Sequence, residues 1–425
     1  MIKYTRSVID HFRNTNTSRC KSLFITSTAP VAGSFTNSES EAEMNMNPYQ
    51  VKIKQQVEKT KFHIGLQHNI PLIQSTITPA YPTQETIEST IDLAKRSGAT
   101  SRIIAVGSRG AIDLAKAVTL ALNGDNVDGD KSTPIVEEMI LIPSTLGAVM
   151  ACTMTDTLVY NMHEEGLCLP SGLKSSYISD SNPFAFQNTS KVIIAPENSV
   201  FNSNIITFES NGDIISQLKE QKQPLPPTID DAAYAVLTLC VDTAVSLSLS
   251  SSSPNNEALL KNATQNAISA LKTEVEDEES KLQKQIYITN ALILAGQIFN
   301  LTNFENFKKH DSNHTLARRS VPLALASALL PTYYPNVNLL TFLATLLPGL
   351  CDVYHSQKTI PVISMINKSL SKITPPSLAS QMESRHPPDL QTMLDKIDGN
   401  LILWDHYEDE SEEILEEILH RSLNR

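Results

Sequence analysis

The feature that most constrains the fold of this chain is a change of pattern about halfway along its 425 residues. Up to about residue 195, short apolar runs of strand length alternate with amphipathic stretches of helix length. From Ile229 onward, long segments with an apolar repeat of roughly 3.6 residues dominate, beginning with 231–249, 255–274 and 278–300. The first pattern predicts a doubly wound parallel sheet, and the second predicts an all-helical domain.

The apolar runs give the expected order of elements in the first half. Strands are predicted at 22–27, 70–76, 101–106, 138–143, 157–160 and 191–195. Thr83 is the expected N-cap of a helix that ends at Gly98, and another helix is predicted over 113–122. A proline-rich stretch near 224–227 separates the two patterns. We therefore predict an α/β domain over residues 1–220 and an all-helical domain over 221–425.

Charge and cysteine usage exclude several classes of protein. The formal net charge of −12 argues against nucleic acid as a partner, because phosphates are bound mainly by clustered Lys and Arg. The five cysteines are odd in number, and no two of them have the CxxC spacing. This usage indicates reduced thiols in an intracellular protein. The cytoplasm is the expected compartment, and a basic N-terminus leaves mitochondria as the alternative. We expect the protein to act on a small-molecule substrate, and these observations are compatible with a homo-oligomer.

A segment without charged residues between Arg319 and Asp352 raises the question of a membrane span. Pro322, Pro331, Pro335 and Pro348 interrupt it, so no clean run of about 20 apolar residues remains. We therefore predict two or three helices buried in the all-helical domain, and no membrane span.

Four segments, in order along the chain, carry a resemblance to a known family. Ala99–Val118 (ATSRIIAVGSRGAIDLAKAV) is similar to a strand followed by GGGSxxDxAK, and Ile142–Thr153 (IPSTLGAVMACT) to IPTTAGTGSEVT. Thr238–Ser246 (TLCVDTAVS) is similar to THAIEAYVS, and His310–Pro331 to a block that opens HxxxH and closes PHGxANAxLLP. On these segments the chain resembles the iron-containing alcohol dehydrogenase family, within the dehydroquinate synthase-like superfamily that includes glycerol dehydrogenase. The resemblance spans nearly the whole chain from about Ser22. It implies that the α/β domain over residues 1–220 is of the dinucleotide-binding type and that a cleft lies between it and the all-helical domain.

The resemblance implies a site for NAD or NADP. A glycine-rich turn between a strand and a helix binds diphosphate because the helix N-terminus offers free N–H groups and glycine permits close approach. The positions that match the family's nucleotide-binding segments are Gly107, Ser108, Gly110, Asp113, Lys116, Ser144, Thr145 and Gly147.

Two positions depart from the family pattern at this site. Arg109 stands where the family has glycine, and its side chain either blocks the pyrophosphate or swings out and neutralises it. Ser27 stands where family members that use NAD often carry Asp, and a neutral residue there favours NADP over NAD.

The family's metal site is eroded in this sequence. The resemblance places one ligand at His310 and a proton-relaying, catalytic residue at His314. The other ligand positions are Ala235 for the family's Asp and Leu239 for a His, or Asp231 and Ala235 in a shifted register, and Leu323 for the last His. Because alanine and leucine have no donor atoms, we do not expect a divalent metal.

Three functions remain open at this point. The first is NAD(P)-dependent hydride transfer with a small alcohol, aldehyde or oxo-acid, without the metal. The second is a catalytically inactive pseudoenzyme that binds a metabolite or a partner. The third is a metal-dependent dehydrogenase in which carboxylates such as Asp231 or Asp242 have replaced the lost ligands.

Overall fold

The structure, a computed structural model, divides into two compact units. One comprises Met1–His163 with Leu167–Leu225, and the other comprises Glu164–Gly166 with Pro226–Arg425. The structure describes residues 2–4, 20–27, 48–67, 70–77, 81–124, 135–154, 157–162, 166–168, 190–194, 227–249, 254–308, 320–334, 337–354, 361–370, 391–393, 395 and 410–423.

The first unit is built on a six-stranded sheet in the order β1-β8-β5-β4-β2-β3, and every neighbouring pair is parallel. The strands are β1 (Ile2–Tyr4), β2 (Ser22–Ser27), β3 (Leu72–Ile77), β4 (Arg102–Gly107), β5 (Glu138–Pro143) and β8 (Ser190–Ile194). Two short strands, β6 (Val159–Asn161) and β7 (Gly166–Cys168), form a separate pair. The sheet confirms the predicted doubly wound, parallel architecture.

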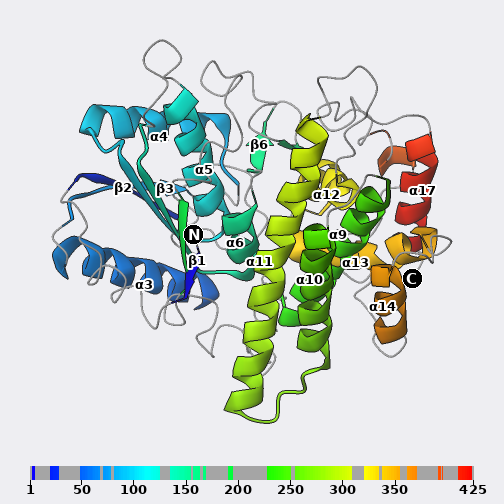
Figure 1. The fold of residues 1–425 in the computed structure, drawn as a ribbon. Helices are drawn as coiled ribbons and strands as arrows, with labels where there is room; N and C mark the ends of the chain where they lie inside the picture. Colours follow the sequence, from blue (N-terminus) through cyan, green and yellow to red (C-terminus); the bar gives the residue numbers. More distant parts are fainter. Residues whose placement is uncertain are drawn as a thin grey trace. The chain divides into compact units, whose positions relative to one another are not determined.

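Helices cover both faces of this sheet, as a parallel sheet requires. The helices are α3 (Pro48–Phe62), followed by a π-helical turn (His63–Gln67), α4 (Gln84–Ser97), α5 (Arg109–Gly124) and α6 (Leu146–Thr153). In Figure 1, α3 lies on one face of the sheet while α4 and α5 lie on the other. Helix α4 begins as predicted, because the Thr83 hydroxyl accepts a hydrogen bond from the backbone N–H of Thr86.

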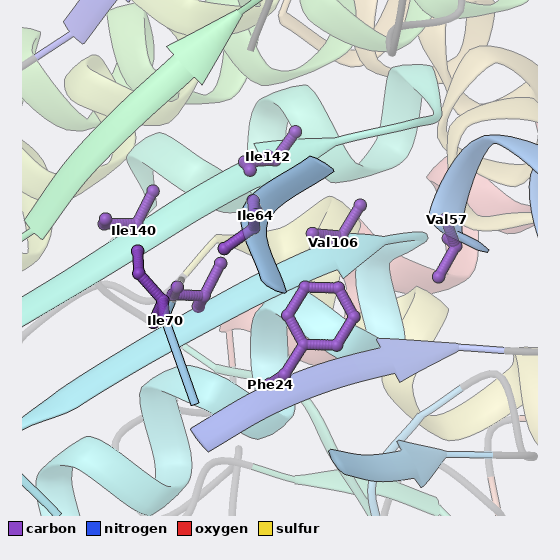
Figure 2. Packing of buried hydrophobic residues seen from close by; sticks show 8 residues of the cluster. Phe24, Val57, Ile64, Ile70, Val106, Ile140 and Ile142 are labelled. Carbon is purple, nitrogen blue, oxygen red and sulfur yellow. The ribbon is translucent and has the colours of Figure 1, made fainter. Parts of the chain in front are cut away.

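The strands are apolar on both sides because alternate residues enter different cores. On the α3 face, Phe24 belongs to a buried cluster with Val106 of β4 and Ile142 of β5, the next strand beyond β4. Val57 of α3 and Ile64 of the π-helical turn complete it from the helical side (Figure 2). Residues of the opposite parity, such as Leu23 and Ile103, are equally buried. Because both faces of the central strands are buried, the ends of the strands are the part of the sheet that a ligand can reach.

The described elements of the second unit are helices, apart from Gly166, the first residue of β7. They are α9 (Ile229–Leu249), α10 (Pro254–Lys272), α11 (Glu278–Lys308), α12 (Val321–Tyr333), α13 (Leu339–Val353), α14 (Pro361–Leu370) and α17 (Glu410–Leu423). Helix α9 contacts α10, α11, α12, α13 and α14, so it forms the centre of this unit. The predicted all-helical character of the second half is confirmed.

The uncharged segment that raised the question of a membrane span forms α12 and α13, both largely buried. Pro331 and Pro348 lie inside these helices rather than ending them, which the sequence reading did not foresee. None of the helices in the described part of the chain is long and apolar enough to cross a bilayer.

The acidic C-terminal helix α17 packs against α13 at a close approach. Its apolar positions Leu415, Ile418 and Leu419 are buried, while its glutamates include exposed ones such as Glu417. Gly349 of α13 has no room for a side chain, because a Cβ there would lie 2.6 Å from the carbonyl oxygen of Ile418 and 2.7 Å from the hydroxyl of Ser422. The glycine therefore sets the distance between the two helices.

Candidate nucleotide-binding site

The strand order creates a topological switch point between β2 and β4. From β2 the chain continues to β3 on one side, whereas from β4 it continues to β5 and β8 on the other. Ligands of open α/β sheets bind outside the carboxyl ends of the strands at such a point. The predicted phosphate turn, Gly107 to Gly110, follows β4 directly and leads into α5.

Gly107 is required by the turn itself. Its φ of +142° is unfavourable for other residues, and a Cβ there would lie 2.8 Å from the hydroxyl oxygen of Ser27. The carbonyl oxygen of Gly107 accepts a hydrogen bond of 2.8 Å from the backbone N–H of Ser144, which ties the ends of β4 and β5 together. The turn thus has a fixed backbone path at the switch point.

Ser27 and Ser108 face each other across this turn. The Ser27 hydroxyl accepts from the backbone N–H of Ser108 at 3.0 Å, and the two hydroxyl oxygens are 2.7 Å apart. One N–H group of the turn is therefore already satisfied within the protein. The remaining N–H groups of the first turn of α5 have no acceptor within their own helix, as in any helix, and carry a partial positive charge.

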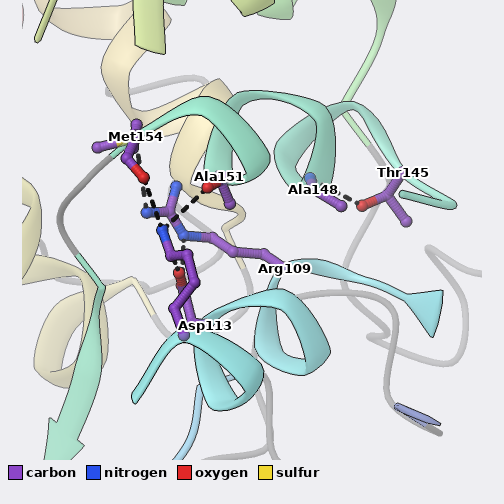
Figure 3. A network of polar contacts seen from close by, with 7 residues as sticks. Arg109, Asp113, Thr145, Ala148, Ala151 and Met154 are labelled. Atoms are coloured by element: carbon purple, nitrogen blue, oxygen red, sulfur yellow. Dashed lines mark hydrogen bonds and ion pairs between the residues drawn. The ribbon is translucent and has the colours of Figure 1, made fainter. Parts of the chain in front are cut away.

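Arg109 follows neither of the two courses considered from sequence. It is the first residue of α5, and its side chain runs between α5 and α6 toward Met154 (Figure 3). Its Nε donates to Asp113 Oδ2 at 2.9 Å, and both side chains are buried. The position where the family has glycine thus carries a buried ion pair, and the guanidinium is directed away from the turn.

Lys116 completes this buried cluster. Its Nζ donates to the carbonyl oxygens of Ala151 at 2.9 Å and Met154 at 3.0 Å, and it lies 3.5 Å from Asp113 Oδ1. Those two carbonyls belong to the C-terminal end of α6, where a cation is favourable. Of the two residues predicted to bind the cofactor, Lys116 therefore fastens α5 to α6, whereas Asp113 pairs with Arg109 and Lys116 within α5.

Two further ionisable side chains border the cluster and stay neutral. Burial raises the pKa of Tyr81 to about 12, with nearby Arg109 lowering it and Asp113 raising it. Burial also raises the pKa of the Cys152 thiol, against the effect of Lys116 and together with that of Asp113. Near neutral pH, neither group adds a negative charge beside Arg109.

The segment between β5 and α6 brings the remaining predicted residues to the same edge of the sheet. Thr145 is the N-cap of α6, and its hydroxyl accepts from the N–H of Ala148 at 3.2 Å. Ser144 is fully buried, and its hydroxyl has no hydrogen-bond partner among the described residues. A Cβ added to Gly147, in the first turn of α6, would meet no atom within 4 Å.

The positions of the family's metal ligands do not fit a metal where the structure describes them. Ala235 and Leu239 are buried in α9, and Leu323 is buried in α12. Their side chains have no donor atoms. No three His, Cys, Asp or Glu side chains in the described part of the chain converge to share an ion. His310 and His314 lie outside the described residues.

Asp231, the candidate replacement ligand, has a structural role at the start of α9. Its Oδ2 accepts from the backbone N–H of Thr228 at 3.1 Å and from the hydroxyl of Thr341 at 3.1 Å, while its own N–H donates to the Thr228 hydroxyl. This is the reciprocal arrangement of a capping box. Burial raises the pKa of Asp231 despite these hydrogen bonds.

A pH-dependent gain in stability is expected from Asp231→Asn. A raised pKa means that Asp231 stabilises the fold most when protonated, below the ordinary value of 3.8, and that this contribution is lost as pH rises through the folded-state pKa. Asparagine keeps the cap without the charge. In urea unfolding followed from pH 3.5 to 7, the variant should gain stability relative to wild type as pH rises.

Asp277→Asn provides the matched control for this prediction. Asp277 precedes α11, and its carboxylate accepts hydrogen bonds from the backbone N–H and from the hydroxyl of Ser280, each at 2.7 Å. These hydrogen bonds lower the pKa of Asp277. Its variant should lose stability relative to wild type as pH rises through the same interval. If the stability difference from wild type changed with pH in the same direction in both variants, the raised pKa of Asp231 would be contradicted.

No family model and no curated protein matches the sequence, whereas solved structures match the fold along almost the whole chain. An iron-containing alcohol dehydrogenase from Thermococcus thioreducens is 16% identical, with a TM-score of 0.57 over 99% of this chain and 98% of that one. An NADH-dependent butanol dehydrogenase from Thermotoga maritima is 13% identical, with a TM-score of 0.58 over 99% and 96% of the two chains. A maleylacetate reductase from a Rhizobium species is 13% identical, with a TM-score of 0.57 over 100% and 95%.

These likenesses establish the class of fold. The chain has the two-part fold of the iron-containing alcohol dehydrogenases, as the four sequence segments implied. At identities of 11–16% the likeness concerns the fold, so activity and ligands are inferred from the residues of this chain.

Sequence reasoning missed the cluster formed by Arg109, Asp113 and Lys116. The signal was present, because residues four and three positions apart on a helix share one face. From the sequence, Arg109 was considered only in relation to a ligand, although Asp113 in the same helix is its partner. Ser27 was likewise assigned by its place in the family pattern, and its hydrogen bonds to Ser108 depend on a separate strand.

Proposed function

We propose that this protein is an NAD(P)-dependent oxidoreductase that transfers hydride between the nicotinamide and a small alcohol, aldehyde or oxo-acid, without the metal of its structural relatives. The turn after β4 and the first turn of α6 would hold the diphosphate and the nicotinamide end. Hydride transfer is the chemistry of the cofactor, and the protein supplies binding and orientation. A bound nicotinamide would supply the hydride acceptor for the alcohol, and His314, which lies outside the described residues, would accept the hydroxyl proton.

Gly147 is the observation that carries this proposal. Glycine inside a helix is less favourable than alanine by about 0.8–1 kcal/mol, and nothing within 4 Å prevents a methyl group at this position. The fold therefore has no need for glycine here, in a chain with only 14 glycines among 425 residues. A ligand that approaches the backbone closely would need it, and the residue lies beside the switch point where such ligands bind.

The alternative is a pseudoenzyme, and two observations favour it. The buried apolar side chains of Ala235, Leu239 and Leu323 stand where the resemblance places metal ligands. In addition, Ser108, Asp113 and Lys116 already have partners inside the protein. On this reading the turn is kept because it joins β4 to α5, and no nucleotide binds.

Nucleotide binding separates the two functions. The purified protein would be titrated with NADPH and with NADH while nucleotide fluorescence is followed, and bound metal would be assayed on the same sample. Micromolar binding supports the oxidoreductase and justifies screening aldehydes and oxo-acids for turnover. Absence of binding by both nucleotides up to millimolar concentration contradicts it and leaves the pseudoenzyme.

Gly147→Ala is expected to have opposite effects on stability and on binding. The free energy of unfolding should rise by about 0.5–1 kcal/mol, because alanine favours the helix and meets no obstacle. The affinity for NADPH should fall by roughly tenfold or more, because the methyl group keeps the ligand from the backbone. Urea unfolding and fluorescence titration of one preparation measure both, and unchanged affinity would remove Gly147 from the site.

A further inference from the structure

Exposed apolar side chains gather where α10 connects to α11. Five large apolar side chains are strongly exposed among the described residues, and three of them are Val275, Leu282 and Ile286, at 50%, 52% and 44%. The other two, Phe62 and Met162, lie singly elsewhere in the chain. A single exposed apolar residue is ordinary, whereas several in one segment indicate an interaction surface.

The packing of α11 explains why Leu282 and Ile286 are exposed. Lys284 and Ile288 are buried on the other side of the same helix, and Lys284 pairs with Asp230 of α9 at 2.9 Å. Residues two positions before and two positions after Lys284 point away from it, because each residue turns the helix by about 100°. The contacts with α9 therefore present Leu282 and Ile286, which share one face as residues four apart, to the outside.

The same segment carries a surplus of negative charge. Exposed glutamates precede the apolar pair at Glu274, Glu276, Glu278 and Glu279. Residues 274–286 contain two lysines, and both are engaged within the protein. Lys281 pairs with Glu278 at 3.3 Å, and Lys284 pairs with Asp230. The α11 patch, defined as Val275, Leu282, Ile286 and these four glutamates, therefore combines an apolar face with an acidic flank.

This combination favours one class of partner. The acidic flank repels the phosphates of nucleic acids and of anionic lipids, which are bound by Lys and Arg. A second copy of the chain would bring the same glutamates to the interface, and juxtaposed like charges are costly. A basic amphipathic helix matches both features, because its Lys and Arg face the glutamates while its apolar stripe has the same spacing as Leu282 and Ile286.

We propose that the α11 patch docks a basic amphipathic helix of another protein, with Leu282 and Ile286 as the apolar anchors. The glutamates accelerate the encounter and select a basic partner, whereas burial of the two anchors slows dissociation. The surface belongs to the helical unit alone, so its role does not depend on whether the protein binds a nucleotide.

Fluorescence anisotropy with a labelled synthetic peptide tests this proposal on the full-length protein. The probe is a leucine–lysine peptide of about 15 residues, long enough to form a helix, with its leucines on one helical face. A peptide of the same composition with the leucines distributed around the helix is the control. The amphipathic peptide should bind with micromolar affinity, and the control should bind roughly tenfold more weakly or worse.

Matched variants locate the binding surface. Replacing Leu282 and Ile286 together by serine should weaken peptide binding roughly tenfold or more, and circular dichroism should show an unchanged fold because both side chains are exposed. Phe62→Ser is the control, because Phe62 is 56% exposed but lies outside the patch, and its affinity should equal that of wild type. Replacing Glu276 and Glu279 by glutamine should weaken binding severalfold and reduce its salt dependence.

Three results would overturn the proposal. Equal binding of the two peptides, or equal affinity in the double serine variant, would mean that the peptide responds only to the net charge of −12. Absence of binding up to millimolar concentration would remove the basic helix as the partner. A dimer in sedimentation of wild type that disappears in the double serine variant would show instead that a second copy covers the patch.

Discussion

Asp113→Ala is expected to lower the free energy of unfolding by about 3–5 kcal/mol, the range for removing one partner of a buried ion pair. The variant leaves the Arg109 guanidinium and the Lys116 ammonium buried without the carboxylate that they share. It also weakens the link between α5 and α6, since Lys116 bonds the last carbonyls of α6 from this position. Urea unfolding followed by circular dichroism measures the change.

The neighbouring helix supplies a matched control. Asp92 and Arg96 of α4 form an ion pair of the same residue types, at the same separation of four residues and the same 2.9 Å distance, but their side chains are 55% and 79% exposed. Exposed pairs of this kind contribute about 0.3–0.5 kcal/mol, so Asp92→Ala should change stability by no more than roughly that amount. Similar losses in the two variants would mean that the cluster at Arg109 is not the buried ion-pair network described above.

Gly349→Ala is expected to lower the free energy of unfolding by about 1–3 kcal/mol, the range for overpacking a well-packed interface. The new methyl group would meet the backbone oxygen of Ile418 at 2.6 Å, and a backbone atom cannot rotate away as a side chain can. The expected relief is displacement of α17 from α13. Urea unfolding measures the loss, and limited proteolysis should cleave the C-terminal helix faster in the variant.

The same substitution at Gly147 is the control for this prediction. Both glycines lie inside helices, but a methyl group at Gly147 meets nothing within 4 Å. Alanine should therefore stabilise the protein at Gly147 and destabilise it at Gly349. If Gly349→Ala were neutral with unchanged proteolysis, the close approach of α13 and α17 would not govern the docking of α17.

The sequence by itself determined the elements whose cause is local. The strands Ser22–Ser27 and Glu138–Pro143 have the predicted bounds, since an apolar run ended by turn residues is a local signal. Thr83 was identifiable as an N-cap for the same reason. The absence of charged residues between Arg319 and Asp352 predicted buried helices, and α12 and α13 are such helices. Pro331 and Pro348 were expected to interrupt this segment and instead lie within the helices.

The tertiary structure decided which partners the candidate site residues have. Strand order alone places Ser27 opposite Ser108, and the packing of α6 on α5 gives Lys116 its two carbonyl acceptors. Arg109 had two plausible courses in the sequence, and the burial of Asp113 between helices gave it a third. Such contacts join residues far apart in the chain, and their free energy depends on burial, which no local pattern of residues specifies.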